Sequence, residues 1–149
     1  MKVLSHNFPF DTVQMPLNCF DAAFRSFVQN VLSEVNRRGM APLGMKSLGG
    51  SGEMVRHGGI TPEEGLRYAM SLPVAATISG METPEVLTQN PAIAGGFEPQ
   101  SNSAMQALRE RCKNDAADGR YELFKTTKKY DGDVGRKTHE YPSARELPA

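Results

Sequence analysis

Three short apolar segments alternate with longer helical patterns, and this alternation limits the folds open to the chain. The segments predict strands over 11–15, 40–45 and 74–79. Amphipathic helical patterns occupy the stretches between them. Strands that alternate with helices are joined by right-handed crossovers and run parallel, so the sequence predicts an α/β fold.

The pattern after the first strand predicts one continuous helix. Large apolar residues recur every three or four positions from Phe20 to Val35, with polar residues between them. Asn18 or Asp21 can cap the start of this helix. Gly39 is placed to end it in the left-handed conformation.

Two later helix starts carry clear capping signals. Thr61, Pro62 and Glu64 have the spacing of a capping box, in which the threonine and glutamate side chains bond the free backbone N–H groups. Thr83 and Pro84 repeat the threonine–proline start. We therefore expect helices to begin at these two positions.

The remaining stretches are less regular. Five glycines in 47–59 predict a mobile loop without regular structure. The strand over 74–79 lacks alternation, as expected for a strand buried on both faces. A last helix is predicted over 102–117, with a buried face formed by Met105, Leu108 and Cys112. We expect one domain over 1–119 and an extended polar tail over 120–149.

The charge balance excludes some partners. Seventeen basic residues match seventeen acidic ones, so the chain has no overall field for nucleic acid or an anionic membrane. No apolar run approaches the roughly 20 residues that span a bilayer, and the first ten residues do not resemble a secretory signal. We expect a cytoplasmic protein without nucleic-acid or membrane partners.

Cysteine and histidine usage indicates no metal centre. Cys19 and Cys112 are far apart in sequence and form no CxxC pair, which excludes a disulfide framework or a structural zinc site as the main organiser. His6, His57 and His139 lack the spacing of metal ligands. We therefore expect no metal. Cys19 is either a nucleophile or, more simply, a buried free thiol.

Three parallel strands alone leave two open sheet edges. Ordering the backbone costs about 1–2 kcal/mol per residue, while each buried large apolar side chain returns about 1.5–3 kcal/mol. The apolar side chains of three short strands and four helices are too few to offset clearly the entropy cost of ordering the backbone. We therefore expect the chain to be part of a larger structure, or to self-associate through its open edges.

Several polar features after the strands have two interpretations each. The glycines of 49–52 let backbone amides approach a phosphate, or form a plain flexible loop. The junction Gly80–Pro84 suits an anion at a helix N-terminus, or is a capped connection. Gln14 lies inside an apolar strand, so its amide needs a backbone or ligand partner.

The charged segment near the C-terminus also has two interpretations. Lys125, Lys128 and Lys129 surround Tyr130 and could contact RNA, but Asp131 and Asp133 dilute that charge. A solvated tail is the simpler interpretation.

Three stretches together resemble the aldo/keto reductase family. They are FDTVQMPLN (10–18), GMAPLGMKSLGGSG (39–52) and TPEEGLRYAMSLPVAATISGMETPEVLTQN (61–90), in the family's order and spacing. DGRYELFKTTKKYDG (118–132) resembles the ending of one bacterial branch. The resemblance covers about 8–133 and implies a partial (β/α)8 TIM barrel, with family strands six to eight and the site at their C-terminal ends. It identifies the chain as similar to the C-terminal half of such an enzyme.

The resemblance also implies an NADP cofactor, with NAD as a second option, and assigns residues to its nicotinamide end. Gln14 matches the strand-six glutamine that hydrogen-bonds the carboxamide. Met45 matches the position, often aromatic, that stacks on the nicotinamide; a thioether packs there more softly.

The rest of the cofactor follows from the same resemblance. The segment along the pyrophosphate corresponds to Lys46, Ser47, Leu48 and Gly49. The loop at the adenosine phosphate corresponds to Gly80, Met81, Glu82 and Thr83. The pair that holds the adenine corresponds to Gln89 and Asn90. Val86 and Gly80 replace the arginine and lysine of many members, so these residues do not support NADP over NAD.

In the family, hydride transfer to a carbonyl uses a tyrosine, aspartate, lysine and histidine from the first half of the barrel. None of Tyr68, Tyr121, Tyr130 and Tyr141 matches that tyrosine, so no catalytic residue is assigned. The chain alone is expected to be inactive, and a small carbonyl substrate is expected only in a completed barrel. The tail around Phe124 and Tyr130 is a candidate for one wall of the substrate pocket. The alternatives are a non-enzymatic α/β module that binds a nucleotide or a protein, and an RNA-associated protein.

Overall fold

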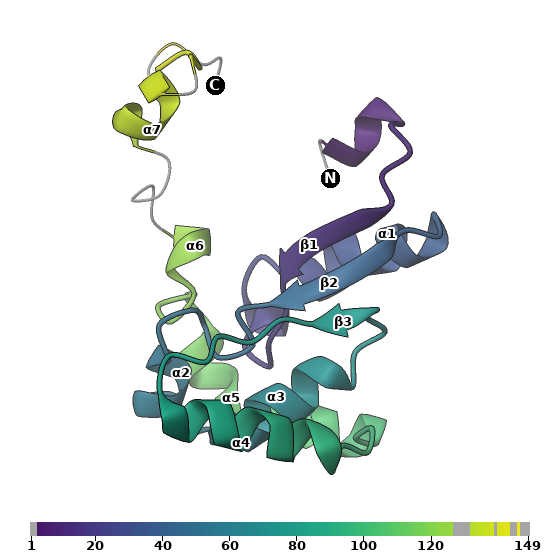
Figure 1. The fold of residues 1–149 in the computed structure, drawn as a ribbon, viewed down its shortest axis with the longest axis vertical. Coiled ribbons are helices and arrows are strands. Elements are labelled where there is room, and N and C mark those ends of the chain that lie inside the picture. The colour runs from purple at the N-terminus through teal and green to yellow at the C-terminus, as the bar shows by residue number, and fades with distance from the viewer. Residues whose placement is uncertain (1–2, 127–131, 139, 144–145, 147–149) are drawn as a thin grey trace.

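The computed structural model describes residues 3–126, 132–138, 140–143 and 146, and its core is a three-stranded parallel sheet (Figure 1). The strands lie in the order β1-β2-β3, with Gln14 opposite Leu43 and Leu43 opposite Ala76. Their bounds are Thr12–Pro16 for β1, Ala41–Met45 for β2 and Ala76–Thr77 for β3. The predicted α/β class with parallel strands is confirmed.

Helices of several kinds connect and follow the strands. Short 3₁₀ turns are η1 (Val3–His6) and η2 (Asp21–Ala23), and η3 (Val28–Leu32) is a π-helical stretch that runs directly into α1 (Ser33–Arg37). The α-helices that follow are α2 (Glu53–Arg56), α3 (Pro62–Met70), α4 (Pro84–Gly95), α5 (Asn102–Ala116), α6 (Leu123–Thr126) and α7 (Asp133–Thr138). Helix α1 contacts β2, and α3 contacts both β3 and α4.

The predicted helix starts are confirmed. Thr61 and Glu64 form the complete capping box: Glu64 N–H donates to Thr61 Oγ1, and Thr61 N–H donates to Glu64 Oε2. Thr83 caps α4 with its side chain, and Gly39 ends the first helical segment with a φ of +72°. Helix α5 buries the three predicted residues, Met105, Leu108 and Cys112.

The prediction of one continuous helix over 20–35 is wrong. Phe24 is extended, with a φ of −145°, and Arg25 has a φ of +44°. The cause is the buried Asp21 carboxylate, which accepts from the backbone N–H groups of Phe27 and Val28 at 2.9 Å. It thereby gives the segment that starts at Phe27 an N-terminus of its own, separate from η2.

Two predictions of irregular structure are also wrong in part. The glycine-rich stretch 47–59 contains helix α2, anchored by the fully buried Met54. The predicted extended tail contains helices α6 and α7, and its Glu122 and Lys125 are buried against the domain. Lys128, Lys129, Tyr130, Asp131 and His139 lie outside the described residues.

The described helices cover one face of the sheet. On that face Met15 is buried, while Gln14 on the opposite face is exposed. Only two residues of the predicted third strand pair with β2, and Ala76 and Ile78 are exposed. The prediction that this strand is buried on both faces is therefore wrong, because no described element lies beyond it or over its open face. No helix within the described residues could cross a membrane.

Candidate functional site

A cavity of about 220 Å³ lies at the carboxyl ends of β2 and β3, against the start of α4. Seven of the twelve residues predicted to bind a cofactor line it: Lys46, Ser47, Leu48, Gly80, Glu82, Gln89 and Asn90. The structure thus brings together segments that are more than thirty residues apart in sequence. The cavity also takes in Ser51 and Ser79, which the sequence analysis did not single out.

Ser47 is a buried polar residue of this cavity, 4% exposed, whose hydroxyl has no hydrogen-bond partner among the described residues. A buried polar group left unpaired costs about 1–3 kcal/mol. Ser47 lines the cavity, so a ligand bound beside it is a candidate source of the hydrogen bond that the fold does not supply.

The first turn of α4 is satisfied internally. Pro84 has no N–H to offer, and Val86 N–H donates to Thr83 Oγ1 over 3.3 Å. The Thr83 hydroxyl and the backbone N–H of Glu85 hold the pKa of the Glu85 carboxyl below its usual range. This geometry favours the capped connection over the anion site at Gly80–Pro84.

Asn90 joins α4 to the segment that leaves β3. Its Nδ2 donates to Ser79 Oγ over 3.0 Å and to the Gly80 carbonyl over 3.1 Å. Both amide hydrogens are therefore engaged within the fold, and the amide oxygen is the atom left for an adenine amino group. Gln89, on the same helix, is exposed.

The two residues predicted at the nicotinamide contact each other on the open face of the sheet. Gln14 Nε2 donates to the Met45 thioether sulfur over 3.1 Å. The sequence predicts a backbone or ligand partner for the Gln14 amide, whereas the partner in the structure is a side chain, and a thioether is only a weak acceptor. Neither residue lines the 220 Å³ cavity.

Lys46 and Gly49 also border a smaller hollow of about 170 Å³, which Phe124 lines from the C-terminal segment. The Lys46 ammonium lies 4.7 Å from the centre of the Phe124 ring, a cation–π contact. Gly49 has a φ of +82°, and a Cβ there would lie 2.9 Å from the Tyr121 carbonyl. Met81 is 47% exposed and lines a separate hollow beside α4.

A buried charge cluster is linked to the Lys46 segment through Asn18, whose amide bonds both Glu122 and the Lys46 carbonyl. Lys125 Nζ lies 2.8 Å from Asp21 Oδ1 and 2.9 Å from Glu122 Oε2, and all three side chains are at most 2% exposed. Burial raises the pKa of Glu122, although hydrogen bonds from Lys125 and Asn18 oppose that shift. Sequence analysis missed this cluster, because nothing local indicates that Asp21 and Lys125 meet.

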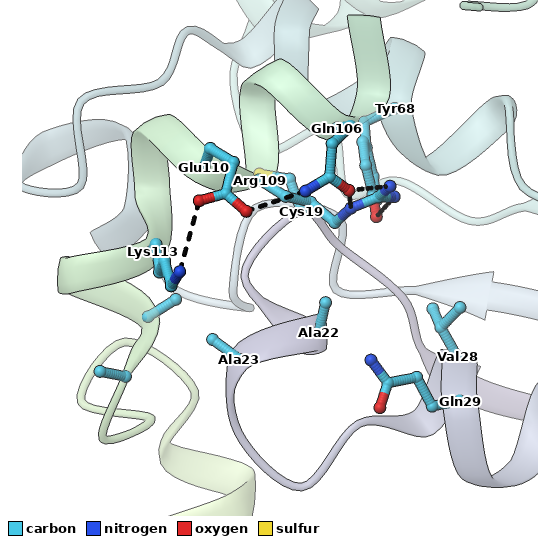
Figure 2. A pocket seen from close by; sticks show the side chains of 12 residues that line it. Cys19, Ala22, Ala23, Val28, Gln29, Tyr68, Gln106, Arg109, Glu110 and Lys113 are labelled. Carbon is cyan, nitrogen blue, oxygen red and sulfur yellow. Dashed lines mark hydrogen bonds and ion pairs between the residues drawn. The ribbon is translucent and has the colours of Figure 1, made fainter. Parts of the chain in front are cut away.

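A larger hollow of about 550 Å³ lies between α5 and 19–29, and none of the twelve predicted residues lines it. The polar side chains on its α3 and α5 side bond one another (Figure 2): Arg109 donates to Gln106 and to the Tyr68 hydroxyl, and Lys113 pairs with Glu110. These pairs leave that wall of the hollow with its polar groups satisfied.

Cys19 lies at the edge of this hollow and is a buried free thiol, as the simpler interpretation predicted. A hydrogen bond with the Cys112 thiol, together with burial, raises the pKa of Cys19. A thiol held in its neutral form is a poor nucleophile. Among the described residues, no group of three or more His, Cys, Asp or Glu side chains could hold a metal ion.

No family model, curated protein or solved structure matches the chain. The resemblance to the aldo/keto reductases therefore depends on the sequence motifs.

Proposed function

We propose that the chain is the cofactor-binding portion of an aldo/keto reductase-like oxidoreductase, a partial (β/α)8 barrel with family strands six to eight. The cavity at the ends of β2 and β3 would hold the adenosine–pyrophosphate end of a nicotinamide dinucleotide. The observation that carries the proposal is the buried, unpartnered hydroxyl of Ser47 in the cavity where seven predicted cofactor residues meet.

A phosphate oxygen fits this position. Ser47 can donate to it, the adjacent Lys46 supplies a positive charge nearby, and Gly50 and Gly52 let backbone approach without side chains. Ligand pockets usually enclose about 300–1,000 Å³. A cavity of about 220 Å³ suits only part of a dinucleotide, which agrees with a site divided between the cavity and the open sheet face.

The nicotinamide would lie on that open face. Gln14 is exposed there and held by Met45, so its amide oxygen can accept from the carboxamide while the thioether packs against the ring. The cofactor supplies the hydride when bound; the residues of this chain bind and orient it.

One sheet face and both sheet edges are covered by no described element, which supports a barrel completed by further strands that would supply the proton donor and the carbonyl pocket. The chain alone would then bind cofactor without catalysing carbonyl reduction.

Titration of the 149-residue chain with NADH and NADPH, followed by nicotinamide fluorescence, tests the proposal. Removing one hydrogen bond to a charged group costs about 1.5–3 kcal/mol, so Ser47→Ala should weaken binding about tenfold or more. Gln14→Ala should weaken it as well. Ser103→Ala, an exposed serine of α5, is the matched control. Saturable binding that neither Ser47→Ala nor Gln14→Ala changes would reject the proposal.

A non-enzymatic nucleotide-binding module is the second candidate, because Gln14 and Met45 do not line the cavity. In that case ADP should bind as tightly as NADH, and Gln14→Ala should change neither affinity. Tighter binding of NADH that depends on Gln14 favours the oxidoreductase.

A further inference from the structure

We infer that this cavity selects dinucleotides whose adenosine ribose has a free 2′-hydroxyl, and that Glu82 makes the selection. The inference rests on the proposed function and names the cofactor class, NAD(H) rather than NADP(H). It is carried by the distribution of charge around the cavity.

Two charged side chains line the cavity, Lys46 and Glu82. They come from different segments: Lys46 directly follows β2, while Glu82 lies between β3 and α4. The Lys46 ammonium stacks on Phe124, at the side of the cavity where the glycine-rich loop begins. The lysine therefore belongs to the pyrophosphate end, and the carboxylate belongs to the α4 end, where Gln89 and Asn90 would meet the adenosine.

Glu82 has room to reach a ribose. Its Oε1 lies 3.7 Å from the position that a Cβ on Gly80 would occupy, so the absence of a side chain at Gly80 leaves space beside the carboxylate. A carboxylate accepts a hydrogen bond from a ribose 2′-hydroxyl, whereas it repels a 2′-phosphate. Selection between the two cofactors follows from this one group.

Three groups near Glu82 cannot offset the repulsion. Both amide hydrogens of Asn90 bond Ser79 and Gly80, and the Val86 N–H bonds Thr83. Pro84 has no N–H, and the Val86 side chain in the cavity lining is apolar. A 2′-phosphate at the α4 end would therefore meet the Glu82 carboxylate, while Lys46, the cation among the described lining residues, lies at the pyrophosphate end.

Calorimetric titration of the full chain with NADH and NADPH measures the selection. A second pair of probes, 5′-AMP and adenosine 2′,5′-bisphosphate, isolates the 2′-phosphate without any substitution. We expect the unphosphorylated member of each pair to bind about tenfold tighter or more. Glu82→Gln should reduce the affinity ratio of NADH to NADPH, and Glu82→Lys should make NADPH the tighter ligand. Glu85→Lys makes the same charge change in the first turn of α4, but Glu85 does not line the cavity, so the preference should persist.

Three results would overturn the inference. NADPH binding as tightly as NADH, with both saturable, would reject the selection while leaving the proposed function in place. A ratio that shifts equally in Glu82→Lys and Glu85→Lys would assign the effect to net charge rather than to Glu82. Failure of all four probes to bind would reject the proposed function, and the inference with it.

Discussion

The side-chain amide of Asn18 donates a hydrogen bond to Oε1 of Glu122 over 3.0 Å, although 104 positions separate the two residues in sequence. The same nitrogen lies 3.4 Å from the Lys46 carbonyl oxygen, which it also bonds. One amide therefore connects the end of β1, the C-terminal segment and the wall of the candidate site. A displacement of the C-terminal segment should reach Lys46 through this link.

Lys125→Met should strongly destabilise the protein. The substitution leaves the Asp21 and Glu122 carboxylates buried without their cation, and breaking a buried ion pair in this way costs about 3–5 kcal/mol. Urea unfolding followed by circular dichroism measures the change. Lys113→Met removes an exposed pair with Glu110 and should cost about 0–1 kcal/mol. Equal unfolding midpoints for the two variants would contradict this account.

Glu122 should make stability fall as the pH rises above its ordinary pKa of 4.5. Burial raises the pKa of Glu122 in the folded chain, so the folded state binds this proton more tightly than the unfolded state. The contribution is therefore full below the unfolded pKa and is lost as the pH rises through the folded one. Glu122→Gln lacks this titration. The free energy of unfolding of the wild type, relative to that of the variant, should therefore decrease as the pH rises from the unfolded to the folded pKa of Glu122. Urea titrations at several pH values measure the difference; an increase with pH would refute it.

Gly58→Ala should destabilise the chain, because a Cβ there would lie 2.5 Å from the Phe20 ring and 2.7 Å from the Met54 carbonyl. Overpacking of this kind costs about 1–3 kcal/mol. Gly95→Ala is the opposite case, since nothing lies within 4 Å of that Cβ and the residue ends α4. It should stabilise by up to about 1 kcal/mol. The thermal unfolding midpoints of the two variants should therefore shift in opposite directions. Shifts in the same direction would indicate a general effect of removing glycine rather than crowding at Gly58.

The free edge of β1 should make the purified chain self-associate. Thr12 begins this strand and is exposed, and a lysine on an edge strand disfavours pairing with a second strand. We expect light scattering to give a mass above 16.3 kDa for the wild type and a lower mass for Thr12→Lys. Thr88→Lys, on an exposed position of α4, controls for the added charge. A monomeric wild type would show that the edge needs no partner.

The elements that depend on local signals could be predicted from the sequence. The capping box of Thr61 and Glu64 and the side-chain cap of Thr83 both involve partners three residues away, so pattern alone places these helix starts. The parallel direction of the strands could also be predicted, because strands that alternate with helices are joined by crossover connections. The residues assigned to the cofactor came from the resemblance to the aldo/keto reductases instead, and their role stays a prediction.

The errors arise where the structure of a segment depends on what packs against it rather than on its own pattern. The helix over 20–35 is interrupted because Asp21 turns its carboxylate to the N–H groups of Phe27 and Val28, where Lys125 also meets it. Period and propensity contain no information about a lysine more than a hundred positions away. The length and burial of the third strand were predicted too high because an apolar run indicates a tendency to be buried but not whether a covering element is present.

The Lys125 cluster has a consequence for incomplete chains. Any product of premature termination or proteolysis that ends before Glu122 would keep Asp21 in the interior but lose its ammonium counter-ion. Such a product would contain every strand and most helices, yet it would have to expose or protonate that carboxylate. Chains that contain Leu123–Thr126 can therefore neutralise the buried Asp21 carboxylate, whereas shorter products cannot, and quality-control proteases would encounter the shorter products partly unfolded.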